Sequence, residues 1–111
     1  MTQNTYATIN IDALLAAGIV EPALSRKFIA KLAWREQEKE QLNDYRNGHP
    51  SFRLAELEDT GKYVNEAENA TKKALLDLNK AYKKATGRYI VNGLIKDREN
   101  LRQILDDIAA V

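Results

Sequence analysis

The stretch from Ser51 to Thr86 contains no proline, and its apolar residues recur every seven positions. One set of positions reads Leu54, Gly61, Glu68, Leu75, Tyr82, and the other reads Leu57, Val64, Thr71, Leu78, Ala85. This coiled-coil-like spacing predicts one long helix, with Ser51 as its N-cap and Gly87 as the residue that ends it. Glu68 makes the middle of this seam polar. We interpret it as half of an ion pair or a local polar break rather than a general acid, because a lone carboxylate is a weak sign of catalysis.

A second helix is predicted from Pro22 to about Arg46, since proline suits the first turn of a helix. Its first half carries a stripe of Leu24, Phe28, Ile29 and Leu32. The seven polar residues from Arg35 to Gln41 predict that the second half of this helix is exposed to solvent on most sides. Residues 47–50 then predict a turn, with His49 exposed in it.

Two further helices are expected, one at each end. Asp12 is expected to cap a short helix over Ala13–Ala17 that Gly18 ends. A fourth helix is predicted from about Tyr89 to Ala110, because its apolar residues have helical spacing. The expected fold is therefore all-α: an antiparallel helical hairpin or bundle with one long central helix and a short N-terminal helix. Residues 1–20 are expected to form an arm and docking helix, and residues 21–111 the helical bundle.

Short connections favour antiparallel neighbours, so the fourth helix is expected to run back along the long one. That alignment predicts Asp106 or Asp107 near Lys72 or Lys73. The long helix is expected to extend beyond its neighbours and leave apolar residues for a partner or a second copy to cover.

Composition narrows the functional classes. The 17 basic and 16 acidic residues give a formal charge of +1, which provides no global attraction to nucleic acid or membrane. Apolar runs such as Ala13–Ala17 are too short to span a bilayer, and the first residues do not resemble a signal peptide. A cytoplasmic protein is the expectation.

We find no constellation for catalysis in the sequence. Cysteine is absent and His49 is the single histidine, which disfavours a zinc site. No nucleophile motif, phosphate-binding loop or dinucleotide fingerprint is present. We therefore expect no enzyme activity, no metal site and no cofactor.

Apolar and aromatic residues of the first two helices are the candidate partner interface. Trp34 lies off the main stripe, so it either lines a second contact surface or is left partly exposed, and packing against the N-terminal segment is the alternative. The candidate interface comprises Ile9, Ile11, Leu14, Leu15, Phe28 and Trp34.

A cluster of basic residues marks the end of the long helix. Its candidate anion-binding or nucleic-acid-binding face comprises Lys73, Lys80, Lys83, Lys84 and Arg88. A phosphate-bearing ligand could use such a face. A solvated lysine face is the preferred interpretation, because lysines without arginine forks or interleaved aromatics are poor evidence of recognition.

The expected function is that of a non-catalytic helical interaction or assembly protein, binding a protein partner or further copies of itself through its helix faces. A phage or mobile-element accessory or inhibitor protein would fit this size and composition. Binding of nucleic acid or nucleotide phosphate through the lysine face is the alternative.

Overall fold

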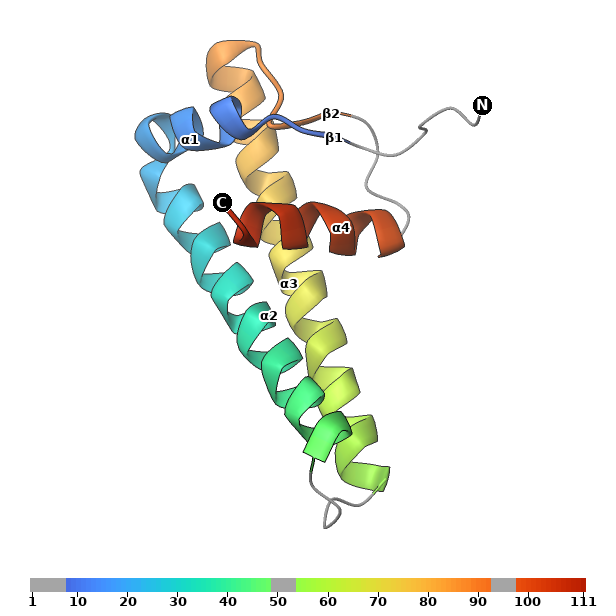
Figure 1. The fold of residues 1–111 in the computed structure, drawn as a ribbon. Coiled ribbons are helices and arrows are strands. Elements are labelled where there is room, and N and C mark those ends of the chain that lie inside the picture. Colours follow the sequence, from blue (N-terminus) through green and yellow to red (C-terminus); the bar gives the residue numbers. More distant parts are fainter. Residues whose placement is uncertain (1–7, 49–53, 93–97) are drawn as a thin grey trace, which may run out of the picture.

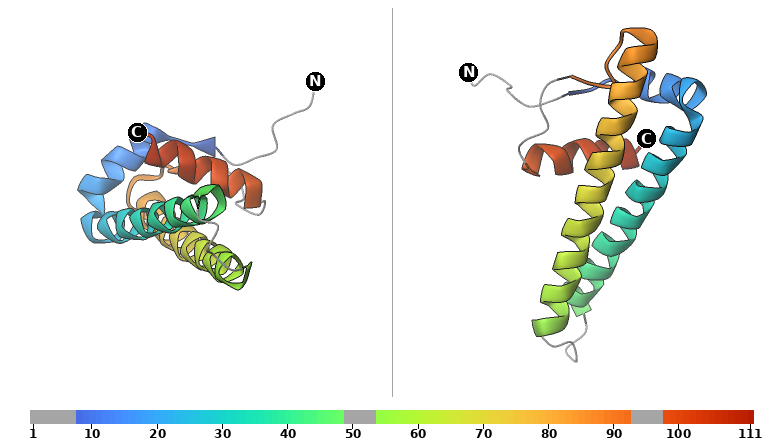
Figure 2. Two further views of the ribbon diagram at one scale, coloured as in Figure 1. Left: turned by 60° about the horizontal axis from the view of Figure 1, so that its bottom comes forward. Right: turned by 180° about the vertical axis from the view of Figure 1, so that it is seen from behind.

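The computed structural model describes residues 8–48, 54–92 and 98–111, with side chains described for 8–44, 61–92 and 99–111. Two long helices, α2 (Pro22–Gly48) and α3 (Leu54–Thr86), lie side by side as an antiparallel hairpin (Figures 1 and 2). The predicted all-α class with a long central helix is confirmed. The expected N-cap Ser51 and the turn residue His49 lie outside the described residues.

Gly87 ends α3 as predicted. Its φ of 77° is left-handed, a conformation that glycine adopts without steric cost. Its N–H donates to the Lys83 carbonyl at 2.8 Å, which satisfies one of the last helical acceptors. Basic residues Lys83 and Lys84 occupy the last turn, where the helix dipole favours positive charge.

The N-terminal helix is longer than expected. Helix α1 spans Ile11–Val20, so Gly18 lies within it rather than after it. Its N-cap is Asn10, not Asp12: the Asn10 Oδ1 accepts from the Ala13 N–H at 3.1 Å. Only Glu21 separates α1 from α2, and Pro22 begins α2 as predicted. The chain therefore turns sharply between the two helices (Figure 1).

The prediction that the fourth helix begins near Tyr89 is wrong. Thr8–Ile9 (β1) and Val91–Asn92 (β2) form a two-stranded antiparallel ribbon, with Ile9 opposite Val91. β-branched residues such as Ile90 and Val91 favour extended backbone over helix. The Asn79 side chain stabilises this extended backbone, because its Oδ1 accepts hydrogen bonds from the Ile90 N–H at 2.8 Å and the Val91 N–H at 3.1 Å.

The last helix, α4 (Arg98–Ala109), crosses the hairpin instead of running back along α3 (Figures 1 and 2). The expected antiparallel alignment of these two helices is therefore wrong. The extended residues of β2 replace the first turn of the predicted helix, and α4 packs its apolar face against both hairpin helices.

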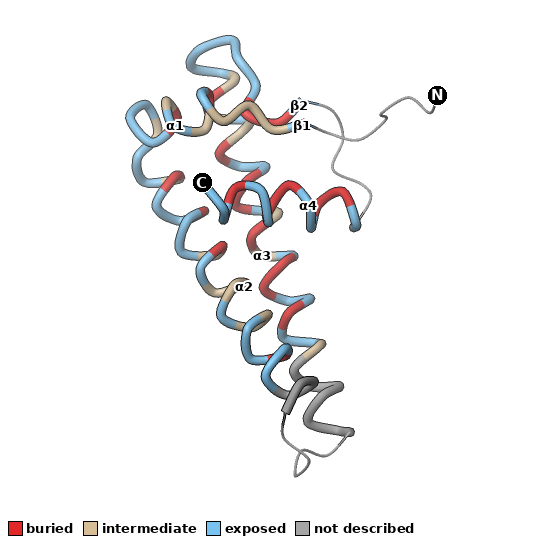
Figure 3. Tube along the Cα trace, viewed as in Figure 1, coloured by how far each residue is buried: buried red, intermediate tan, exposed pale blue. Residues whose placement is uncertain are grey.

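The core lies where α1, the ribbon and α4 cover the hairpin (Figure 3). It combines residues of all four helices and of β2, with Ile9 of β1 packed against them. These core residues are Ala13, Ala17, Phe28, Leu32, Ala74, Leu75, Leu78, Tyr82, Ile90, Val91, Leu101, Ile104, Leu105 and Ile108. Ala13 and Ala17 are both fully buried in α1, and such small residues let that helix approach its neighbours closely. The predicted heptad seam supplies the α3 side of this core, with Leu75, Leu78 and Tyr82 buried.

Candidate interaction surface

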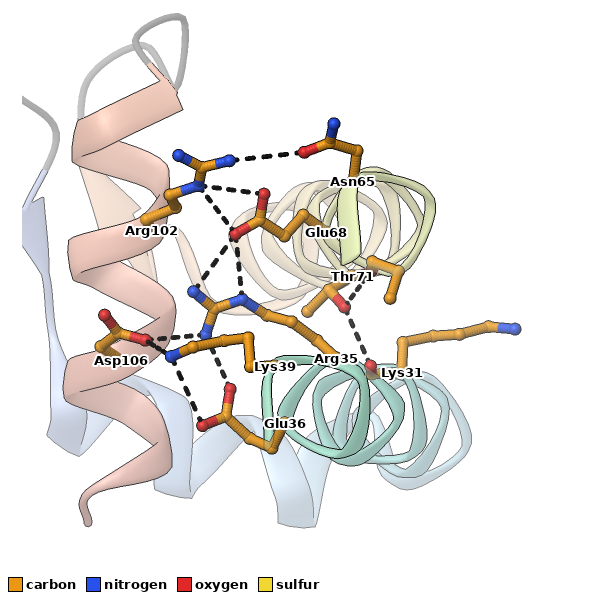
Figure 4. Close-up of polar contacts among 10 residues, drawn as sticks. Lys31, Arg35, Glu36, Lys39, Asn65, Glu68, Thr71, Arg102 and Asp106 are labelled. Carbon is orange, nitrogen blue, oxygen red and sulfur yellow. Dashed lines mark hydrogen bonds and ion pairs between the residues drawn. The ribbon is translucent and has the colours of Figure 1, made fainter. Parts of the chain in front are cut away.

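An ion-pair network with a buried centre joins α2, α3 and α4 (Figure 4). Arg35 of α2 donates from Nε and Nη2 to the Glu68 Oε2 of α3, each at 3.3 Å. Arg102 of α4 donates from Nε to both Glu68 oxygens, at 3.1 and 3.0 Å. Only 1% of the Arg35 and of the Glu68 side chain is exposed. The interpretation of Glu68 as half of an ion pair is therefore confirmed.

Asp106 extends this network at the C-terminal end of α4. Its Oδ1 accepts from the Arg35 Nη1 at 2.9 Å and from the Lys39 Nζ at 2.6 Å. The sequence predicts Lys72 or Lys73 of α3 as its partner, but its partners belong to α2 because α4 crosses the hairpin. Partial burial on its own would raise the Asp106 pKa, but hydrogen bonds and positive charge from Lys39 and Arg35 outweigh it, and the pKa lies below the usual 3.8.

The charges in this network balance. Arg35 also donates to the Glu36 Oε2 at 2.7 Å, so its guanidinium reaches carboxylates on three helices. Within the part of the chain that the structure describes, the network holds three cations, Arg35, Lys39 and Arg102, and three carboxylates, Glu36, Glu68 and Asp106. Such an arrangement fixes the positions of the three helices relative to one another.

No buried side-chain nitrogen or oxygen lacks a hydrogen-bond partner among the side chains that the structure describes. Within residues 8–48, 54–92 and 98–111, no group of three or more His, Cys, Asp or Glu residues could hold a metal ion. The polar interior of this part of the protein is therefore internally satisfied.

An apolar groove lies between α1, the first turns of α2 and the C-terminal end of α4. Its volume is about 340 Å³. The groove is lined by Leu14, Leu15, Gly18, Ser25, Phe28, Ile29, Leu32, Ile108, Ala109 and Val111. Among the side chains that the structure describes, no charged one lines this groove, and Ser25, the polar lining residue, is itself buried.

Large apolar side chains remain exposed beside this groove. Leu15 is 61% exposed, Ile29 58% and Val111 74%, although all three line the groove wall. Ile19, one helical turn after Leu15 on α1, is 84% exposed. These four residues, together with the apolar groove, form what we call the apolar surface. A cluster of this kind is typical of a binding face rather than of scattered surface residues.

The structure brings only some of the predicted interface residues to this surface. Leu14, Leu15 and Phe28 line the groove. Phe28 is almost fully buried, so it offers a partner little surface to contact. Ile9 belongs to the ribbon and packs against the core. Ile11 is half-buried in the first turn of α1.

Trp34 lies apart from the groove on α2 and is half-buried. Its indole Nε1 donates to the Glu38 Oε1 at 3.3 Å, and the Lys31 ammonium lies 5.6 Å from the centre of the indole ring. These contacts occupy both the polar edge and the face of the indole, as is common for a tryptophan at a helix surface.

The predicted basic face is partly engaged in local contacts. Lys73, Lys80, Lys84 and Arg88 are exposed. The Lys83 ammonium, however, donates to the Gly87 carbonyl at 2.8 Å and lies 4.6 Å from the Tyr89 ring centre. A shallow hollow of about 350 Å³ beside Lys73 is lined by Asn69, Lys72, Lys73, Leu76 and Asp77, so a carboxylate shares it with the lysines.

Sequence reasoning missed the burial of Arg35 and the exposure of Ile29. Arg35 follows Phe28 by seven positions and Leu32 by three, so spacing alone places it on the inner stripe of α2. The prediction overlooked this because Arg35 is the first of seven consecutive polar residues, which together were expected to be exposed. The sequence pattern places Ile29 on the buried stripe with Phe28 and Leu32, but it is the residue directly after Phe28, so its side chain turns away from the core and lines the groove.

Comparisons of this chain with family models, curated proteins and solved structures find no match. None of the helices in the described residues combines the length and the hydropathy that crossing a bilayer requires.

Proposed function

We propose that this chain is a non-catalytic helical protein that works by binding another protein chain through the apolar surface. The observation that carries this proposal is the exposure of Leu15, Ile19, Ile29 and Val111 around a groove whose described lining residues carry no charged side chain. Fully burying one such side chain is worth about 1.5–3 kcal/mol, so a partner that covers this surface gains substantial free energy.

The arrangement of the groove also supports a binding role. Its walls come from three helices whose relative positions are set by the core and by the ion-pair network. A groove held in place before binding costs less ordering entropy when a partner docks. Its apolar lining with a single buried hydroxyl suits apolar side chains, as the centre of a protein interface does.

Site-specific photo-crosslinking tests this proposal in cells that naturally produce the protein. A photoreactive residue replaces Leu15 in one variant and Leu76 in the control. Both leucines are large, apolar and exposed, but Leu76 lies on the hollow of α3, away from the groove. We expect covalent protein adducts from position 15 and none of comparable yield from position 76.

Equal adduct yields at the two positions, or none at position 15, would contradict the proposal. A further variant, Ile29→Lys, should abolish the adducts from position 15, because an ammonium beside the groove penalises an apolar partner. Circular dichroism of each variant verifies that the helical fold is intact.

A further inference from the structure

We infer that the groove of the apolar surface binds a tryptophan side chain of the partner protein, whose indole N–H donates a hydrogen bond to the Ser25 hydroxyl. This inference rests on the proposed function and names the residue that anchors the partner. It is carried by the Ser25 hydroxyl, by the size of the groove and by its otherwise apolar lining.

The Ser25 hydroxyl is a hydrogen-bonding group that opens onto the groove. Ser25 lines the groove and is only 6% exposed. Its backbone N–H donates to the Glu21 carbonyl at 2.9 Å, but among the residues that the structure describes no group bonds to its side-chain oxygen. Every fully buried side-chain nitrogen or oxygen of these residues does have a partner. The Ser25 Oγ therefore keeps some accessible surface, which lies at the groove wall that Ser25 forms.

Gly18 of α1 leaves space beside this oxygen. A Cβ at Gly18 would lie 3.5 Å from the Ser25 Oγ, and Gly18 is itself a groove residue. A larger residue at this position would cover one side of the hydroxyl. With glycine there, the hydroxyl remains open to a group that enters the groove.

The groove is large enough for a bicyclic ring. Its volume of about 340 Å³ is more than twice that of a cavity of about 150 Å³ that accommodates benzene. An indole therefore fits, with room left for part of the adjoining chain. An apolar lining with a single polar group that fixes orientation is typical of sites that hold one ring system.

The chemistry of the lining selects tryptophan among the large side chains. A wholly apolar side chain would shut the Ser25 hydroxyl away from solvent without a partner, which costs affinity. A charged side chain would lose its hydration beside a wall whose described residues offer no opposite charge. The indole ring is large and apolar, and its N–H is a donor that the serine oxygen can accept. Tryptophan is also enriched among the residues that dominate binding energy at protein interfaces.

The first test compares two small probes on the purified full chain. Indole carries the N–H donor, and indene is a hydrocarbon of the same shape with a CH₂ group in its place. An NMR titration follows the methyl signals of Leu14, Ile29 and Ile108, which line the groove, and of Val64, which lines a different hollow. We expect both probes to shift the three groove signals and to leave the Val64 signal unchanged.

Ser25→Ala isolates the hydrogen bond. This variant should weaken indole binding by roughly two- to tenfold, which is the net worth of one hydrogen bond. It should leave indene binding unchanged or tighten it, because the hydroxyl that indene cannot satisfy is gone. Lys80→Ala, at an exposed position of α3, is the control and should change neither dissociation constant. Circular dichroism and urea unfolding verify that both variants keep the fold.

The second test examines the protein adducts formed from position 15. Mass spectrometry of the crosslinked peptide should find a tryptophan within a few residues of the crosslinked site. Ser25→Ala should lower the yield of this adduct, and Lys80→Ala should not.

The inference is overturned if indole fails to shift the groove signals up to its solubility limit, or if Ser25→Ala weakens indole and indene equally or affects neither. An adduct whose partner segment contains no tryptophan also overturns it. None of these results touches the proposed function, because adducts from position 15 would still support it. Absence of any adduct from position 15 would remove both.

Discussion

Arg35 and Glu68 form an ion pair in which only 1% of each side chain is exposed to solvent. Both residues lie at the point where α4 crosses the hairpin, where Asp106 of α4 pairs with Arg35 and Arg102 of α4 pairs with Glu68 (Figure 4). The pair therefore specifies where α4 sits as well as how α2 and α3 align. Removing one member of such a pair leaves a buried charge whose desolvation is no longer compensated.

Glu68→Gln should lower the free energy of unfolding by about 3 kcal/mol, because the buried Arg35 guanidinium loses its partner carboxylate on α3. Urea unfolding followed by circular dichroism measures this change. Glu66→Gln is the matched control: Glu66 is an exposed residue of the same helix, and its substitution should change the free energy by less than about 0.5 kcal/mol.

The double variant Arg35→Met with Glu68→Leu should lose less stability than the sum of the two single variants, since the pair is then replaced by apolar groups. Additive losses of unfolding free energy would show that the two residues act independently, which would contradict the direct hydrogen bonds between them.

Asp106→Asn should weaken the attachment of α4 at neutral pH and remove part of the acid sensitivity of the fold. The Asp106 pKa is lowered in the folded protein, so the stability it contributes is present above pH of about 4 and is lost as the pH falls through the folded-state pKa. The side chain is half exposed, so we expect an effect below about 1 kcal/mol.

Unfolding free energies of wild type and Asp106→Asn measured from pH 7 to pH 3 should converge at the acidic end. A difference that stays constant over this range would contradict the assigned pairing with Lys39 and Arg35. Asp107→Asn, at the exposed neighbouring position, provides the comparison.

Two glycines of the α3 region should respond oppositely to alanine. A Cβ at Gly61 would meet nothing within 4 Å, so Gly61→Ala should raise the free energy of unfolding by about 0.5–1 kcal/mol. Gly87 has a φ of 77°, where an alanine is strained, so Gly87→Ala should lower it by about 1 kcal/mol. Thermal unfolding of the two variants would reveal this opposite behaviour, and a shift in the same direction would refute the assigned backbone of Gly87.

The lysine face should show no strong affinity for nucleic acid. Lys83 is engaged with Gly87 and Tyr89, and Asp77 lies among the lysines of the neighbouring hollow. We expect only weak binding of generic DNA and RNA that disappears as salt approaches physiological concentration. Fluorescence anisotropy across a salt series measures it, with Lys80→Glu/Lys84→Glu as the comparison; tight binding that this variant loses would favour the alternative function.

The sequence predicts the helical hairpin well because its signals are local. Pro22 sets the start of α2, Gly87 ends α3, and the seven-residue rhythm marks the buried side of α3. Glu68 is legible as an interruption of that rhythm. Each of these features depends on residues within one or two turns of each other, which is the range over which spacing and capping arguments operate.

The path of the last helix could not be predicted in the same way. A helical pattern over residues 89–110 conceals the extended Ile90 and Val91, because pairing with Thr8 and Ile9 from the opposite end of the chain decides their conformation. The partners of Asp106 depend on the path of α4, so they could not be predicted from the sequence either. The apolar surface depends on α1, α2 and α4 meeting in space, and no single segment encodes it.

The β1–β2 ribbon has a consequence for how the chain assembles. Thr8 and Asn92 lie far apart in sequence, so pairing them closes a very large loop and costs more chain entropy than zipping two consecutive helices. Folding is therefore expected to nucleate in the α2–α3 hairpin, because its contacts are the most local and cost the least chain entropy. We therefore expect the ribbon to form last, so that substitutions in it accelerate unfolding far more than they slow folding.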